Sequence, residues 1–170
     1  MKRTKLLFVA PVALACWATT ARAQETASAT ATATIVTPIS ITKDVDMNFG
    51  NVAVQSTTGG TVVLAPAGTR TATGGVTLPT TAGTVAAASF TVNGTSGYTY
   101  AITLPSTALT ITSGANTMTV TNFISDPAGT GTLTGGSEVV NVGATLNVSA
   151  AQPAGTYVSA TPFDVTVNYD

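Results

Sequence analysis

The chain has 170 residues and a formal net charge of −1, and this length suits one domain with a substantial hydrophobic core. It contains no histidine and a single cysteine, Cys16, which excludes Ser-His and Cys-His nucleophile pairs and nearly all zinc sites. No glycine-rich phosphate or dinucleotide loop is present either. We therefore expect a protein that is not an enzyme and needs no metal or cofactor.

The first 23 residues have the features of a secretory signal peptide. Lys2, Arg3 and Lys5 are basic, an apolar run covers residues 6–17, and Ala21-Arg22-Ala23 is a small-residue cleavage site before Gln24. We expect export to the periplasm and then to the cell surface or the medium. A membrane anchor and a lipoprotein attached through Cys16 are the alternatives. The apolar run is short for a bilayer, and the site before Gln24 is the better cleavage site.

Cleavage would leave one domain, residues 24–170, with very little charge. Only Lys43 and Arg70 then face seven acidic residues, a formal charge of −5, and no cysteine remains for a disulfide. A surface so poor in basic residues cannot neutralise phosphates, so we expect no nucleic-acid partner. Low charge limits solubility, and it is more natural in a subunit of a large assembly than in a freely diffusing protein.

The first stretch of this domain alternates strictly between small apolar and polar residues. The apolar positions are Ala27, Ala29, Ala31, Ala33 and Ile35, separated by serine or threonine. This period of two predicts a β-strand with one face directed inward. The strand could join the sheet of a neighbouring molecule or the domain's own sheet, or the stretch could be a flexible tail. The pattern does not decide among the three.

Further short alternating segments follow along the chain. Residues 39–54 carry apolar residues at alternate positions, and residues 60–66 predict a short strand. Residues 69–84 are rich in turn residues and predict a long hairpin or loop. Residues 88–105 predict a hairpin that turns at 93–97, with Tyr98 and Tyr100 among its core residues.

A second strand pair is expected around Ser113-Gly114-Ala115, followed by a strand over residues 139–150. The chain then ends in an alternating strand. Its inward positions are Phe163, Val165, Val167 and Tyr169, and its outward positions are Asp164, Thr166 and Asn168. Many short strands separated by Gly, Pro and Asn turns predict an all-β, antiparallel sandwich.

The most polar cluster is Asp44, Asp46 and Asn48. It could hold calcium on a loop, but Phe49 occupies the place of the required glycine and no glutamate follows to close the site. The wet face of a strand explains these residues more simply, so we expect no metal site.

Five acidic residues could supply a carboxylate pair for glycoside hydrolysis: Asp44, Asp46, Asp126, Glu138 and Asp164. Their spacing selects no two of them, and we expect all five to be surface residues.

Three segments carry a resemblance to a known family: residues 29–54, 89–105 and 154–170. They resemble the bacterial secreted family called domain of unknown function 4402, most specifically at Asn48-Phe49-Gly50, at Gly155-Thr156-Tyr157 and in the last strand. That family in turn resembles the archaic chaperone–usher pilins and the spore-coat-U-like proteins.

The pilin resemblance implies an immunoglobulin-like sandwich that lacks its final strand. A periplasmic chaperone would bind Phe163, Val165, Val167 and Tyr169, and an outer-membrane usher would direct assembly. The N-terminal strand of the next subunit, residues 24–35, would then complete the fold. Two departures are the absence of the disulfide found in many such pilins and the small size of the alanines.

This resemblance implies a non-enzymatic structural subunit of a surface fibre, such as a fimbria, or of a coat. The alternative is a monomeric surface module or adhesin that binds glycans or another surface. Glycan binding is the weaker interpretation because the only tryptophan, Trp17, which could stack on a sugar, lies in the predicted signal peptide.

Overall fold

The structure is a computed structural model that describes residues 24–170. Among these residues, Ile35–Asp170 form one compact unit, and the stretch that ends at Thr34 belongs to a separate unit. The predicted signal peptide lies outside the described residues, and so does Cys16. Within the described part of the chain, no helix is long and apolar enough to cross a membrane.

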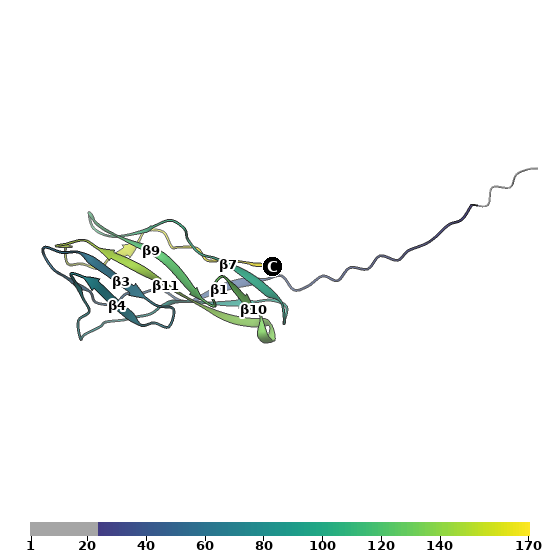
Figure 1. Ribbon diagram of the computed structural model, residues 1–170, viewed down its shortest axis with the longest axis horizontal. Helices are drawn as coiled ribbons and strands as arrows, with labels where there is room; N and C mark the ends of the chain where they lie inside the picture. The colour runs from purple at the N-terminus through teal and green to yellow at the C-terminus, as the bar shows by residue number, and fades with distance from the viewer. Residues whose placement is uncertain (1–23) are drawn as a thin grey trace, which may run out of the picture. The chain divides into compact units, whose positions relative to one another are not determined.

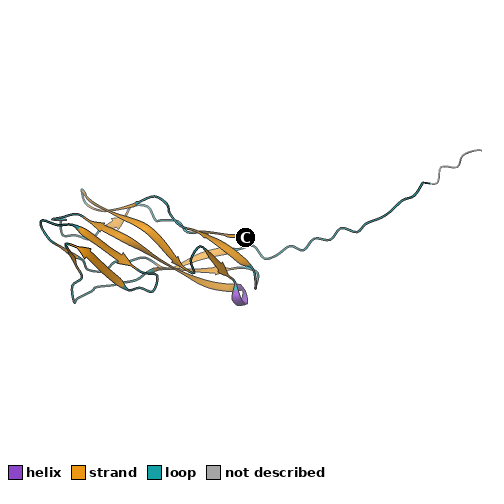
Figure 2. Cartoon of the chain, in the orientation of Figure 1, coloured by secondary structure: helices purple, strands orange, loops and turns teal. Residues whose placement is uncertain are grey.

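Unit Ile35–Asp170 is an antiparallel β-sandwich, in agreement with the predicted fold class, and its described helical structure is one short 3₁₀ turn, Thr134–Gly136 (Figures 1 and 2). All strand pairs formed by the described residues are antiparallel. The larger sheet has the order β1 (Ser40–Val45), β6 (Ala88–Asn93), β11 (Ser137–Val148), β9 (Asn116–Asp126), β8 (Leu109–Ser113) and β12 (Val158–Ser159). In the same sheet, β3 (Gly60–Leu64) pairs with both β11 and β4 (Arg70–Gly74).

Two small sheets complete the unit. One has the order β10 (Thr130–Thr132), β7 (Thr99–Thr103), β13 (Thr166–Tyr169), and the other pairs β2 (Ala53–Val54) with β5 (Val76–Thr77).

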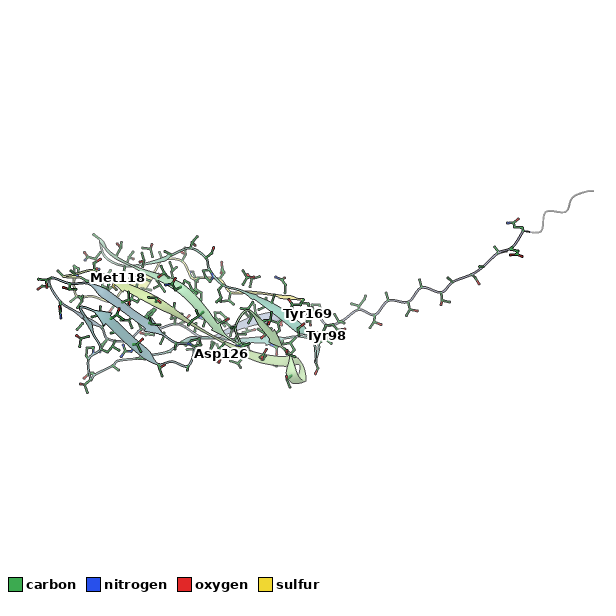
Figure 3. The ribbon with its side chains drawn as sticks, viewed as in Figure 1. Tyr98, Met118, Asp126 and Tyr169 are labelled. Carbon is green, nitrogen blue, oxygen red and sulfur yellow. The ribbon has the colours of Figure 1, made fainter. Side chains whose placement is uncertain are left out.

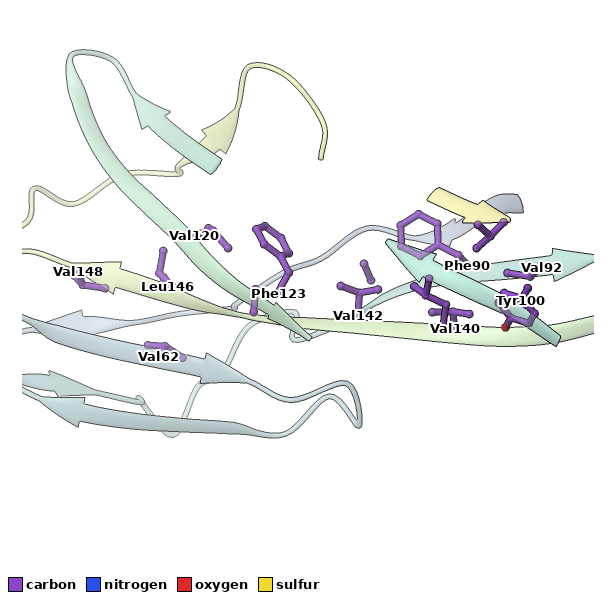
Figure 4. Packing of buried hydrophobic residues seen from close by; sticks show 14 of the residues in the cluster. Val62, Phe90, Val92, Tyr100, Val120, Phe123, Val140, Val142, Leu146 and Val148 are labelled. Carbon is purple, nitrogen blue, oxygen red and sulfur yellow. The ribbon is translucent and has the colours of Figure 1, made fainter. Parts of the chain in front are cut away.

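Strand β11 is the centre of the core. One of its edges pairs with β6 along residues 137–142 and with β3 along residues 144–148, and the other edge pairs with β9. Five of its even-numbered residues are buried in the core: Val140, Val142, Ala144, Leu146 and Val148. Figure 4 shows the packing of most of them. Burying a side chain the size of valine or leucine contributes about 1.5–3 kcal/mol, so this strand supplies a large share of the core.

The predicted hairpin over residues 88–105 is wrong, although its core residues are largely right. Phe90, Val92, Tyr100 and Ile102 are buried as expected, but β6 and β7 belong to different sheets. The turn between them bonds to another segment: Gly94 N–H donates to the Gly136 carbonyl at 3.0 Å, and Gly97 N–H donates to the Leu133 carbonyl at 2.8 Å. These bonds carry the chain from one sheet to the other. The predicted pair around Ser113-Gly114-Ala115 is confirmed as the β8–β9 hairpin.

The last strand is shorter than predicted. Strand β13 begins at Thr166, which pairs with Thr103 of β7, and residues 163–165 form no strand. Pro105 lies two residues beyond Thr103 and has no N–H to offer a continuing ladder, which explains the shorter pairing. The predicted alternation is confirmed, because Val167 is buried and Asp164, Thr166 and Asn168 are exposed.

The predicted strand over residues 39–54 is also shorter, because β1 ends at Val45. Its pairing with β6 shifts register between Lys43 and Val45, where the regular ladder breaks. Met47 and Phe49 still pack against the core beyond the end of the strand, as the alternation predicted.

Candidate functional site: an apolar groove with two open edges

A groove of about 1070 Å³ lies in unit Ile35–Asp170. Its N-terminal rim is residues 43–54 without Asp44, and its C-terminal rim is residues 152–163 without Ala160 and Thr161. The floor is largely apolar and consists of Ala88, Phe90, Leu109, Ile111, Met118, Val120, Leu146 and Val148. A groove of this size exceeds the usual range for small-molecule pockets, about 300–1,000 Å³, so an extended peptide segment fits it better.

Arg70 fixes the turn in the N-terminal rim. Its guanidinium group donates to the carbonyl of Phe49 and, at 3.0 Å, to that of Asn51. Within the turn, the Asn48 side chain accepts the Gly50 N–H at 2.8 Å. Gly50 has φ of +66°, and a Cβ there would collide with the Ala82 carbonyl, so only glycine fits. The Asn48-Phe49-Gly50 motif is therefore the turn that shapes this rim.

Tyr157 fixes the turn in the C-terminal rim. Its hydroxyl group donates to the Pro153 carbonyl at 2.8 Å and accepts the Gln152 side-chain amide at 2.9 Å. Gly155 lies directly against the Ser113 side chain, where a Cβ would collide with Oγ. The second family motif, Gly155-Thr156-Tyr157, thus shapes the opposite rim of the same groove.

Each rim contains a strand that pairs on one side only, and the N-terminal rim is also bonded at Asn48 to Ala86, at Asn51 to Ala82 and, through β2, to β5. Strand β1 pairs only with β6, and β12 pairs only with β8, so each leaves one edge free. No backbone hydrogen bond among the described residues joins the two rims to each other. The groove is closed only at one end, where Ala151 N–H donates to the Gln55 carbonyl at 3.0 Å. Unpaired strand edges beside an apolar floor can accept an added strand.

Charge is confined to one end of the groove. Its charged lining residues are Lys43 and Asp46, whose side chains form an exposed ion pair of 2.7 Å. The rest of the lining is apolar or neutral. An uncharged segment can therefore occupy most of the groove without burying a charge.

The candidate donor residues lie outside the sandwich's sheets. Residues 24–39 contain no strand, and Ala27, Ala29, Ala31, Ala33 and Ile35 are all exposed (Figure 2). Ile35 keeps 96% of its side-chain exposure, which is unusual for so large an apolar residue. Their role as a donor strand stays a prediction.

The candidate chaperone-facing residues occupy two separate places. Phe163 lines the groove, and its ring packs against Phe90 and Phe123 with centroid distances of 6.3 and 5.0 Å. Val165 and Tyr169 are half-buried against the core, and Val167 is buried. Their binding to a chaperone stays a prediction.

Tyr169 holds the start of the sandwich in place. Its hydroxyl group donates to the Thr37 carbonyl at 2.7 Å and accepts the Thr95 N–H at 2.7 Å. Its ring meets that of Tyr98 edge-on at 5.6 Å (Figure 3). Tyr98, predicted to be core, is instead 43% exposed, because it lies in the turn before β7. The hydrogen bond to Tyr169 therefore holds Thr37 near the C-terminus of the chain.

The cluster of Asp44, Asp46 and Asn48 does not converge on one point. Asp44 accepts the Thr91 hydroxyl at 2.7 Å, Asp46 pairs with Lys43, and Asn48 caps its own turn. Each side chain has a separate structural partner, which agrees with their expected place on the wet side of the chain.

Glu138 corrects the expectation that all five acidic residues are surface residues. It is half-buried, and its Oε2 accepts the Tyr100 hydroxyl at 2.7 Å and the Thr132 N–H at 2.9 Å. Burial, together with this hydrogen bond and the charge of Glu138, raises the pKa of Tyr100 well above its ordinary value. Asp126 and Asp164 are exposed as expected.

The structure is that of an all-β, sandwich-like protein with an open and largely apolar groove. The family model "Domain of unknown function (DUF4402)" matches residues 39–169, and the chain therefore belongs to this family. No curated protein and no solved structure matches the chain. Both motifs on which the resemblance rested lie on the rims of the groove.

Sequence reasoning missed the roles of Arg70 and Gln152. Arg70 donates to two backbone carbonyls of the N-terminal rim and lies 21 residues from that of Phe49. Gln152, in the C-terminal rim, donates to the Thr117 carbonyl of β9 and to the Tyr157 hydroxyl group. One signal was available for Arg70: it is one of two basic residues in the stretch 24–170, and an isolated cation in a β-rich stretch merits a search for partners.

Proposed function

We propose that this protein is an exported structural subunit that assembles by strand addition. The N-terminal tail of one copy, residues 24–36, fills the groove of the next copy, and repetition of this step builds a surface fibre or coat. In this proposal the sandwich is of the immunoglobulin type with one strand missing. A periplasmic chaperone and an outer-membrane usher are the partners expected during export.

The observation that carries the proposal is the groove with two unpaired backbone edges. A strand laid between β1 and β12 would satisfy N–H and carbonyl groups on both sides. A ladder of about ten hydrogen bonds, at about 1 kcal/mol net each, would contribute on the order of 10 kcal/mol. The alanine side chains would add only about 3 kcal/mol, so the ladder dominates.

The tail has the composition that this groove requires. Apart from Glu25, residues 24–36 are uncharged, and every second residue from Ala27 to Ile35 is apolar. Small side chains suit this site because Met47 and Phe49 already project from the N-terminal rim toward the core.

The alternative function is a monomeric surface module. A second hollow of about 670 Å³ lies between residues 103–112 and 160–166 and is lined mainly by threonine, serine and proline. Its aromatic residue, Phe163, already packs its ring against Phe90 and Phe123. This hollow therefore supports glycan binding less well than the groove supports strand addition.

A peptide experiment tests the proposal. A chain without residues 24–33 can accept a strand but cannot donate one, and the peptide TASATATATIV should bind and stabilise it. Peptide at about 100 times its Kd should raise the free energy of unfolding by about 2.7 kcal/mol, which is several degrees in Tm. A peptide with the same composition in scrambled order is the control. Equal stabilisation by both peptides, or by neither, would count against strand addition.

A further inference from the structure

We propose that the free edge of β4 pairs antiparallel with the same edge of a second copy of this chain, so that two copies share one continuous sheet. The contact uses neither the N-terminal tail nor the groove. It therefore goes beyond the proposed function and describes how two molecules adhere side by side.

Strand β4 has one unpaired edge. It pairs only with β3, which lies between β4 and β11 (Figure 1). No backbone hydrogen bond outside the strand pairs involves residues 70–74 in the described part of the chain. Thr71, Thr73 and Gly74 are exposed, and no residue of β4 lines the groove. The outer edge of β4 therefore presents free N–H and carbonyl groups.

Strand β4 lacks the features that protect the other two free edges of the main sheet. Strand β1 carries Lys43, Asp44 and a register shift, and β12 is only two residues long. Charges, irregularities and short strands of this kind prevent edge-to-edge pairing in natural sheets. The one charged residue of β4, Arg70, directs its guanidinium group to the carbonyls of the N-terminal rim. The edge of β4 is therefore regular, with its only charge held elsewhere.

The sequence of β4 is self-complementary about a two-fold axis through Ala72. Thr71 then lies opposite Thr73 of the second copy, and Arg70 lies opposite Gly74 of the second copy, so no like charges meet. Cross-strand threonine pairs stabilise antiparallel strands. One such pair already exists here, because the hydroxyl groups of Thr61 in β3 and Thr73 are 2.7 Å apart. A hydroxyl group both donates and accepts, so Thr73 can also bond to Thr71 of the second copy.

The outward face of the sheet continues this pattern up to the edge. One cross-strand row of five uncharged residues runs from β8 to β4: Thr110, Thr119, Asn147, Thr61 and Thr73. Pairing of two edges extends the row into the second copy without bringing charges together. A ladder of five residues is short, so two isolated copies separate readily. Copies that are already linked in a fibre, as in the proposed function, present many such edges at once and adhere far more strongly.

Disulfide trapping tests the pairing in the chain 24–170, which has no cysteine of its own. Thr71→Cys and Thr73→Cys are made as separate proteins, one with a size tag, and are mixed under mild oxidation. In the proposed register the two positions face each other within disulfide reach, whereas two copies of the same position lie roughly 7–8 Å apart. The mixed disulfide should exceed each same-site disulfide by at least about fivefold. Equal yields would show random collision, and an excess of one same-site product would show another register; either result overturns the proposal.

Lysines placed at the edge provide a second test. Adding Thr73→Lys to the first protein and Thr71→Lys to the second puts two lysines opposite each other, which should reduce the mixed disulfide severalfold. Thr117→Lys in both proteins is the matched control, because Thr117 is exposed on β9 of the same sheet, away from the edge. Equal yields with edge lysines and with control lysines would show that the contact does not involve β4.

The same mixture made from chains that lack residues 24–33 separates this contact from the proposed function. The excess of mixed disulfide should remain, because β4 pairs without the tail, and its loss would overturn the proposal. If the excess remains but the chain 24–170 forms no tail-dependent oligomers, the proposed function fails and the edge pairing stands.

Discussion

At the scale of single residues, the groove depends on side chains that bond to backbone groups. Arg70 holds the carbonyls of Phe49 and Asn51, and Tyr157 closes the turn that begins at Gln152. Arg70 reaches the N-terminal rim from β4, which pairs with β3, whereas Tyr157 lies in the C-terminal rim itself, directly before β12. The shape of the groove is therefore sensitive to a few substitutions outside the core.

The first prediction concerns Arg70. Arg70→Ala removes the donors for two carbonyls and should lower the free energy of unfolding by about 1–2 kcal/mol, measured by urea denaturation. It should also weaken binding of the tail peptide, because the rim turn loses its support. Arg70→Lys keeps the charge but loses the planar guanidinium group. Its free energy of unfolding and its peptide affinity should therefore lie between those of the wild type and Arg70→Ala. If Arg70→Ala had the stability and the peptide affinity of the wild type, Arg70 would not support the rim turn.

The second prediction concerns Tyr100 and pH. Because burial and Glu138 raise its pKa above the ordinary 10.0, the folded state keeps the phenol proton while the unfolded state loses it. The contribution of Tyr100 is fully present below about pH 10 and is lost as pH rises above that value. The free energy of unfolding should therefore fall more steeply between about pH 10 and 11.5 in wild type than in Tyr100→Phe. If the free energy of unfolding fell equally with pH in the wild type and in Tyr100→Phe, the raised pKa of Tyr100 would be contradicted.

At the scale of elements, the tail and the groove are two halves of one strand-pairing site in this account. The tail offers alternating small residues and a free backbone, and β1 and β12 offer free edges. A charge on the apolar face of the tail should therefore weaken the pairing more than a charge on its serine and threonine face.

The third prediction compares the two faces of the tail. In the peptide TASATATATIV, Ala31→Asp places a carboxylate on the inward face, where it must be buried without a partner. This change should weaken binding to the chain lacking residues 24–33 by at least about a hundredfold in Kd. Thr30→Asp faces water and should change Kd by only a few-fold. Titration calorimetry measures both, and similar losses for the two peptides would argue against an alternating buried face.

Alternation in the sequence predicted which side chains face the core but not which strands are neighbours. Phe90, Val92, Tyr100 and Ile102 are buried as their period indicated. A period of two is equally compatible with a hairpin partner and with a strand in the facing sheet, and the bonds of Gly94 and Gly97 to a distant segment decide between them.

Part of the candidate site could also be predicted from the sequence. The Asn48-Phe49-Gly50 and Gly155-Thr156-Tyr157 motifs marked both rims, yet their proximity depends on the folded chain. Glu138 was misjudged because its partner, Tyr100, lies 38 residues away, and a charged residue is more often solvated than paired.

At the scale of the whole molecule, low charge and an incomplete-looking sandwich have one common explanation in assembly. A copy with an exposed Ile35 and a largely apolar groove of about 1070 Å³ exposes surface that a neighbour can cover. An isolated copy should therefore associate as its concentration rises.

The most direct test is the sedimentation of the chain 24–170 across a wide concentration range, compared with the chain that lacks residues 24–33. We expect the longer chain to form oligomers that grow with concentration, and the shorter chain to remain monomeric and to bind the tail peptide. A longer chain that stays monomeric at all concentrations and unfolds cooperatively, with no chaperone or donor peptide present, would contradict the account.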